Sequence, residues 1–258
     1  MMFPKKCDTP IHRKRRLRLH FNRMYLQKGL RILPNLFTLG NAFFGFCSII
    51  FASYGDLVAA SYFILLGALM DGLDGRIARY VHVTSEFGMQ LDSLCDGISF
   101  GLAPAMLVYV WQLKKIGGVG FIACAIFLLA GLLRLARFNI TATQQSRFFL
   151  GTPIPIAGCF LATLVLNARN LTFNPSTTIL LLLLVLTLAG CMVSTIPFPT
   201  FKQVSKSTYA IGLVGLSVIA ITMGLVKVLL MLFVGYFLFA LEEYFRARLQ
   251  NSRAYKKV

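Results

Sequence analysis

Long apolar segments follow one another along most of this chain, and they constrain its fold more than any other feature. Hydrophobic residues make up 57% of the 258 residues and charged residues only 14%, a balance unlike that of a soluble domain. A membrane-spanning helix needs about 20 apolar residues. Such segments lie at about 34–53, 57–80, 88–112, 117–138, 153–168, 177–196, 208–223 and 225–245. We predict an all-α, polytopic membrane helix bundle with six to eight transmembrane helices, because two segments are short.

Basic residues gather before the first apolar segment and after the last one. Residues 1–32 hold ten of the 26 Lys and Arg residues, including the run RKRRLR at 13–18. Cytoplasmic flanks of membrane spans are rich in Lys and Arg, so we expect the N-terminus in the cytoplasm, and with eight spans the C-terminus too. A basic run can bind nucleic acid, but beside membrane spans it is more typical of a topology signal that contacts anionic lipid headgroups. We therefore expect no nucleic-acid partner.

The expected organisation has three parts and leaves no room for a separate soluble domain. A basic cytoplasmic segment at 1–32 precedes a transmembrane domain at 33–245, and a basic cytoplasmic tail follows at 246–258.

The scarce acidic residues concentrate around the end of one predicted span and the start of the next. Four of the nine in the chain are Asp71, Asp74, Asp92 and Asp96. Spacings of three and four residues put the two carboxylates of each pair on one helix face. If the two spans are antiparallel, a rise of about 1.5 Å per residue brings the pairs to matching depths. The sequence therefore predicts a square of four carboxylates between two helices, open to the cytoplasm.

Carboxylates inside a membrane need a cation close to them. Each costs about 2.5–3.5 kcal/mol in hydrocarbon even on a lenient insertion scale. Oxygen ligands suit Mg²⁺, Mn²⁺ or Ca²⁺ rather than zinc. Mg²⁺ commonly shares its coordination with substrate phosphates, and two ions can clamp a displacement at phosphorus. We therefore predict a divalent-metal site for phosphate chemistry.

The residues around the aspartates form a longer pattern. Asp71-x-x-Asp74-Gly75-x-x-Ala78-Arg79 is followed by eight residues, Gly88, three residues, Asp92, three residues and Asp96. This order resembles the signature of the CDP-alcohol phosphotransferases. Four further stretches resemble the bacterial phosphatidylserine synthase branch of that family: PNLFTLGNAFFGF at 34–46, GLLRLARFN at 131–139, GTPIPIAG at 151–158 and VSTIPFPTFK at 193–202. Thr152 departs from that branch, which usually has Leu there.

The resemblance implies an enzyme of the bacterial inner membrane that transfers a phosphatidyl group from CDP-diacylglycerol to L-serine and releases CMP, with its active site facing the cytoplasm. It also implies that the enzyme is a homodimer surrounded by membrane lipids. It further implies two bound metal ions, Mg²⁺ or Mn²⁺. The implied metal ligands are Asp71, Asp74 and Asp92, assisted by Asp96, and the implied CDP-binding residues are Asp71, Asp74, Gly75, Ala78, Arg79 and Gly88. Asp96 would also accept the proton of the attacking hydroxyl, although it could instead serve only as a fourth ligand.

The acceptor site has weaker sequence signals. The carboxylate of serine needs a cation, and Arg134, Arg137 and Lys202 are all expected at the cytoplasmic ends of spans, level with the aspartates. Each of them could bind the acceptor or the lipid phosphate, and each could equally be a topology charge or a headgroup contact. We expect Arg134 or Arg137 to be the acceptor ligand.

Three other functions stay open on the sequence. The acceptor could be glycerol-3-phosphate or an inositol phosphate, although a dianionic phosphate would favour a denser basic cluster. An ion-coupled transporter would also place aspartates in the membrane, but we find no pair of similar halves. An intramembrane prenyltransferase would carry two separate Asp-rich motifs, whereas this chain has one.

Overall fold

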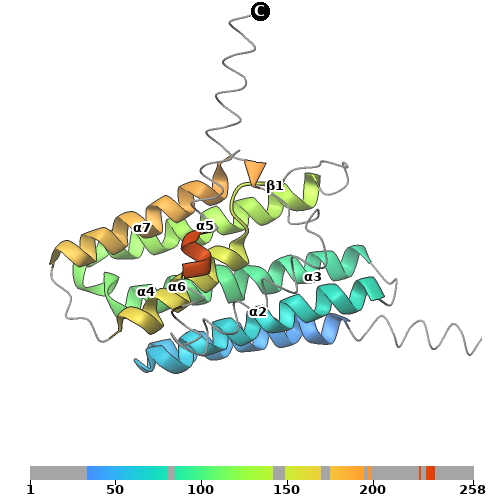
Figure 1. Cartoon of the computed structure of the whole chain (residues 1–258), viewed down its shortest axis with the longest axis horizontal. Helices are drawn as coiled ribbons and strands as arrows, with labels where there is room; N and C mark the ends of the chain where they lie inside the picture. The colour runs from blue at the N-terminus through green and yellow to red at the C-terminus, as the bar shows by residue number, and fades with distance from the viewer. Residues whose placement is uncertain are drawn as a thin grey trace, which may run out of the picture.

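The fold follows from a computed structural model, which describes residues 34–80, 85–141, 149–169, 175–194, 197–198, 227 and 231–235. This part of the chain is a bundle of helices, shown in Figure 1. The helices are one at Pro34–Ser53, α2 at Leu57–Tyr80, α3 at Glu86–Asp96, α4 at Ala103–Trp111, α5 at Gly118–Thr141, α6 at Ile154–Ala168 and α7 at Pro175–Val193. The predicted all-α membrane bundle is confirmed.

Short irregular elements complete the fold. A π-helical turn, η1 (Gly97–Leu102), joins α3 to α4, and a 3₁₀ turn, η2 (Leu113–Ile116), follows α4. Two strands of two residues each, β1 (Phe149–Leu150) and β2 (Pro197–Phe198), pair antiparallel. Neither the π-helical turn nor this pair of strands was predicted from the sequence.

Five of the described helices are long and apolar enough to cross a membrane. They correspond to the first four predicted spans and the sixth. The fifth predicted span is α6, whose 15 residues reach only about 22 Å. Of the last two predicted spans, only residues 227 and 231–235 are described, so the count of six to eight stays a prediction. The basic segments at 1–32 and 246–258 also lie outside the described residues.

The third span lies at the centre of the bundle. It runs continuously through α3, η1 and α4, and 61% of an apolar 18-residue stretch of it is buried, against 28% for the corresponding stretch of each of the first two spans. In Figure 1, the 34–53 helix and α2 lie on one side of it, and α5 and α7 lie together on the other. Fully buried apolar side chains fill this centre, among them Phe100 of η1, Phe127 of α5 and Ile154 of α6. The span that carries Asp92 and Asp96 is therefore held by packing on several sides.

Glycines let the neighbouring helices approach η1 closely. A Cβ atom on Gly158 of α6 would lie 2.8 Å from the carbonyl oxygen of Phe100, and one on Gly45 of the 34–53 helix would overlap the hydroxyl of Ser99. Small residues at such contacts are typical of helix packing in membranes, where close backbone approach supplies much of the attraction. The span that carries Asp92 and Asp96 is thereby fixed against α6 and the 34–53 helix.

Gly158→Ala tests this close approach. The new methyl group would meet backbone atoms, which cannot move aside without shifting a helix, so we expect a loss of about 1–3 kcal/mol of stability, as for an overpacked core. Thermal unfolding of the purified protein in detergent measures it. Gly190→Ala is the matched control, because nothing lies within 4 Å of its added Cβ. An equal loss in both variants would contradict the close-packing interpretation.

Candidate active site

Three carboxylates from two helices meet in the structure. Asp71 and Asp74 come from α2 and Asp92 from α3, and one carboxylate oxygen of each lies within 4.8 Å of the others. Asp74 is buried, whereas Asp71 and Asp92 are half-buried. The chain reverses direction between α2 and α3, as Figure 1 shows, which brings the two predicted aspartate pairs to the same end of the bundle.

Asp96 lies beside this group rather than within it. It follows Asp92 by one turn of α3 and is only 7% exposed. The Nδ2 atom of Asn41, from the 34–53 helix, donates a hydrogen bond of 3.1 Å to its Oδ1 atom. The sequence predicted a square of four carboxylates, whereas the structure groups three of them and gives the fourth, Asp96, a buried amide partner.

The 34–53 helix also contacts the carboxylate group. The hydroxyl of Thr38 donates a hydrogen bond of 2.8 Å to Oδ2 of Asp74. Thr38 and Asn41 are three residues apart and so share one helix face. Neither residue was predicted to have a role in the site. The only signal in the sequence was a pair of polar side chains at helical spacing in an otherwise apolar span.

The group of three carboxylates fits a divalent cation. The Oδ1 atom of Asp92 is buried and has no hydrogen-bond partner among the described residues. An ionised carboxylate oxygen in such a place is unfavourable unless a cation or a donor compensates it. Carboxylate oxygens are the ligands that Mg²⁺ and Mn²⁺ prefer. The donor set therefore agrees with the predicted metal.

The predicted CDP-binding residues follow the carboxylates along the two helices. A Cβ atom on Gly75 would meet nothing within 4 Å, so the surface beside Asp74 is open to a ligand. Gly88 lies in the first turn of α3, where its N–H donates to Oγ of the N-cap residue Ser85 at 3.0 Å. Ala78 and Arg79 belong to α2, but their side chains lie outside the described part of the structure.

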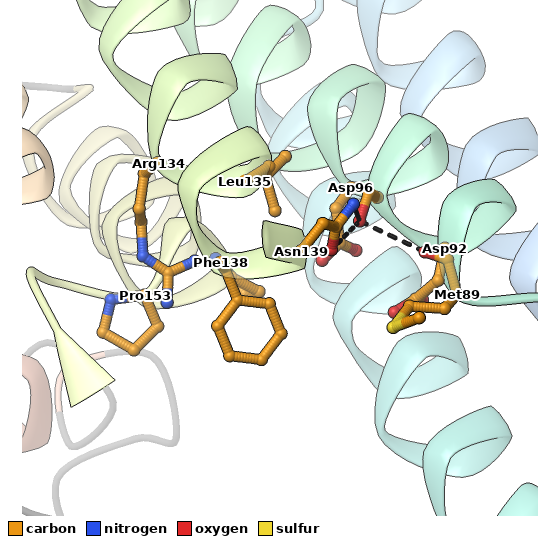
Figure 2. Close-up of a pocket in the computed structure, with 10 residues that line it drawn as sticks. Met89, Asp92, Asp96, Arg134, Leu135, Phe138, Asn139 and Pro153 are labelled. Atoms are coloured by element: carbon orange, nitrogen blue, oxygen red, sulfur yellow. Dashed lines mark hydrogen bonds between the residues drawn. The ribbon is translucent and has the colours of Figure 1, made fainter. Parts of the chain in front are cut away.

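A pocket of about 250 Å³ opens next to the carboxylates, as Figure 2 shows. It suits a small molecule, since drug-sized ligands occupy larger pockets. Arg134 lies at one end of it and Asp92 and Asp96 lie toward the other. The full lining consists of Met89, Asp92, Ser93, Asp96, Arg134, Leu135, Phe138, Asn139, Pro153 and Pro155.

Polar side chains also line the pocket between α3 and α5. The Nδ2 atom of Asn139 donates to Oγ of Ser93 at 2.9 Å and to Oε1 of Gln90 at 3.3 Å. These bonds join α3, which carries Asp92 and Asp96, to α5, which carries Arg134.

The structure separates the three cations that were predicted for the acceptor. Arg134, 8% exposed, lines the pocket. Arg137 instead donates hydrogen bonds to the carbonyl oxygens of Val193, at 3.0 Å, and Ser194, at 3.2 Å. These carbonyls end α7, where a cation is favoured by unpaired acceptors and by the helix dipole. Lys202 lies outside the described residues.

Known proteins match this chain across the whole of the described site. The model of the CDP-alcohol phosphatidyltransferase family matches residues 31–231. A CDP-diacylglycerol–serine O-phosphatidyltransferase of Helicobacter pylori (strain ATCC 700392 / 26695) is 41% identical over 177 residues, 68% of this chain and 75% of that protein. One of Bacillus subtilis (strain 168) is 36% identical over 176 residues, 67% and 93% of the two chains. An archaetidylserine synthase of Methanothermobacter thermautotrophicus is 33% identical over 181 residues, 68% and 73%.

Proposed function

The chain belongs to the CDP-alcohol phosphatidyltransferase family, and we propose that it transfers the phosphatidyl group of CDP-diacylglycerol to the hydroxyl of L-serine, giving phosphatidylserine and CMP. The observation that carries this proposal is the pocket that joins Arg134 to Asp92 and Asp96. Serine has a carboxylate at one end and a hydroxyl at the other, so it matches a cation and a proton acceptor at opposite ends of a small pocket. The names of the relatives, all of which specify serine or a serine lipid, support the same acceptor.

On the donor side, we propose that Asp71, Asp74 and Asp92 hold two divalent metal ions, Mg²⁺ or Mn²⁺, with Asp96 assisting. When bound, such ions neutralise a pyrophosphate and stabilise the departing phosphate oxygen. CDP would lie along the open surface at Gly75, with Ala78, Arg79 and Gly88 around it. A guanidinium such as that of Arg79 can bind phosphate oxygens through two parallel hydrogen bonds.

On the acceptor side, we propose that Asp96 takes the proton of the serine hydroxyl. The hydroxyl oxygen then forms a bond to the lipid-linked phosphorus, and the bond between that phosphorus and the CMP oxygen breaks, so that CMP leaves with the electron pair. A general base must lie within hydrogen-bond reach of the proton that it removes. The position of Asp96 in the pocket lining supports this role.

A second acceptor class is less well matched by the pocket. Glycerol-3-phosphate and inositol phosphate carry a dianionic phosphate, which favours several cations. Arg134 is the one Lys or Arg among the pocket-lining residues of the described chain, and one cation suits the single negative charge of a carboxylate. Release of CMP from CDP-diacylglycerol with serine, glycerol-3-phosphate or inositol phosphate, compared on purified protein, tests the assignment directly.

The cellular setting is part of the proposal. We place the protein in a bacterial inner membrane as a homodimer, with the aspartates facing the cytoplasm, where serine is available. The excess of Lys and Arg in residues 1–32 supports this orientation.

Arg134→Leu is expected to raise the KM for serine about tenfold to hundredfold. This factor corresponds to the free energy of one hydrogen bond to a charged group. The KM for CDP-diacylglycerol should change little, because the lipid nucleotide binds beside Asp71 and Asp74. Steady-state CMP release at varied serine and varied CDP-diacylglycerol measures both constants.

Arg137→Leu is the control for this prediction, three residues away on the same helix. Because Arg137 bonds the end of α7, its loss should lower the thermal stability and affect the serine KM less than Arg134→Leu does. If Arg134→Leu weakened CDP-diacylglycerol and left serine unchanged, Arg134 would belong to the lipid-phosphate side.

A further inference from the structure

We propose that Asn41 is a positioning residue, which fixes the carboxylate of Asp96 through one buried hydrogen bond and thereby gives the 34–53 helix a part in catalysis. The inference rests on the proposed function, because it takes Asp96 to be the residue that receives the proton. It adds a side chain from a helix that carries none of the aspartates.

The hydrogen bond joins two buried groups that are far apart in the sequence. Asn41 is 0% exposed, and its Nδ2 atom lies 3.1 Å from Oδ1 of Asp96. An ionised carboxylate only accepts hydrogen bonds, so the amide must turn its NH₂ group toward Asp96. Hydrogen bonds to a charged group are stronger than neutral ones. Asp96 therefore has one oxygen held by a donor that water does not reach.

Neighbouring helices hold Asn41 itself in place. The hydroxyl of Ser99, on η1, donates a hydrogen bond of 2.8 Å to the backbone carbonyl of Asn41. On α2, a Cβ atom at Gly67 would lie only 2.9 Å from Oδ1 of Asn41, so the glycine leaves the space that the amide occupies. The backbone of Asn41 is thus held by η1, and its side chain packs against α2.

Asn41 is an unfavourable choice for packing alone. Its Oδ1 atom is buried and has no hydrogen-bond partner among the described residues. A buried polar atom without a partner costs about 1–3 kcal/mol, and an apolar residue of similar shape would avoid that cost. The compensating benefit that the structure offers is the bond to Asp96. The bond that orients that carboxylate therefore accounts for a buried amide at this position.

Orientation matters here because proton transfer depends on position. A displacement of about 1 Å in a reacting group can lower a rate by about a hundredfold. Without the Asn41 bond, the Asp96 carboxylate loses the donor that fixes the direction of its Oδ1 atom. Turnover should therefore suffer, while the sites that bind serine and CDP-diacylglycerol stay in place.

Asn41→Leu is the first test. We expect kcat to fall about tenfold to hundredfold, the worth of a hydrogen bond to a charged group, with both KM values little changed. Removal of the unpaired Oδ1 atom favours folding, whereas loss of the donor to the buried oxygen of Asp96 opposes it, so the melting temperature in detergent should change little. Asn41→Asp keeps the shape but loses the donor, and its kcat should fall as well.

Ser48→Ala is the matched control. Ser48 lies two turns further along the same helix, is 0% exposed, and its hydroxyl has no hydrogen-bond partner among the described residues. Its removal should leave kcat unchanged. A fall in kcat as large as that of Asn41→Leu would show that any change in this helix disturbs the site, and would overturn the proposal.

A double-mutant cycle tests whether Asn41 acts through Asp96. Adding Asn41→Leu to Asp96→Asn should lower kcat little further, because residues that act as a unit are not additive. The proposal is overturned if the two losses multiply, or if Asn41→Leu keeps the wild-type kcat. A wrong acceptor assignment would appear separately, as CMP release by the wild-type protein with another alcohol. The same kcat comparison is then made with that alcohol.

Discussion

EDTA is expected to abolish CMP release by the purified protein, and added Mg²⁺ or Mn²⁺ to restore it. The reason is the group formed by Asp71, Asp74 and Asp92, whose carboxylate oxygens lie within 4.8 Å of one another. Without a cation, the negative charge of these carboxylates repels the negatively charged pyrophosphate. Full turnover in the chelator would exclude the metal-dependent mechanism.

Binding of Mn²⁺, followed by calorimetry, tests the same site without turnover. Asp71→Ala and Asp74→Ala should each lose most of the Mn²⁺ affinity together with activity. Asp56→Asn is the control, because Asp56 is exposed and its side chain caps the start of α2 by accepting from the N–H of Ala59 at 3.0 Å. Asn is as good a capping residue as Asp, so this variant should bind Mn²⁺ and turn over normally. Unchanged Mn²⁺ binding by Asp74→Ala would place the metal elsewhere.

Asp96→Asn should lower kcat by about 10²–10⁴-fold, the usual contribution of a general base. The amide keeps the shape of the carboxylate and a carbonyl oxygen that can accept the hydrogen bond from Asn41, but it is a far weaker base. Mn²⁺ binding and the KM for CDP-diacylglycerol should therefore be largely retained. Single-turnover CMP release, which isolates the chemical step from product release, is the measurement.

Glu86→Gln is the control for this change. Glu86 is an exposed acidic residue in the first turn of the same helix, and its substitution should leave kcat unchanged. Near-normal turnover of Asp96→Asn would show that the base assignment is wrong. Loss of Mn²⁺ binding together with turnover would instead favour the other interpretation of the sequence, in which Asp96 is a fourth ligand.

The fold class and the aspartate cluster could both be predicted from the amino-acid sequence. Both depend on local information: the length of an apolar segment decides whether it can span a membrane, and spacing along one helix decides which carboxylates share a face. A short connection between Tyr80 and Glu86 then constrains the two consecutive spans to run antiparallel. For these reasons the sequence is enough to predict the five long spans and the meeting of Asp71, Asp74 and Asp92.

Tertiary packing sets how each helix is rotated and which distant helix it meets. Arg134 and Arg137 are three residues apart with the same chemistry, yet one lines the pocket and the other binds the end of α7. Asn41 has no local feature that indicates its bond to Asp96, 55 residues further along the chain. Such contacts depend on close packing among several helices, set by glycines such as Gly67 and Gly158 and by the π-helical turn η1. Hydrophobic periodicity does not specify these contacts, because in a membrane both the lipid-facing and the buried sides of a helix are apolar.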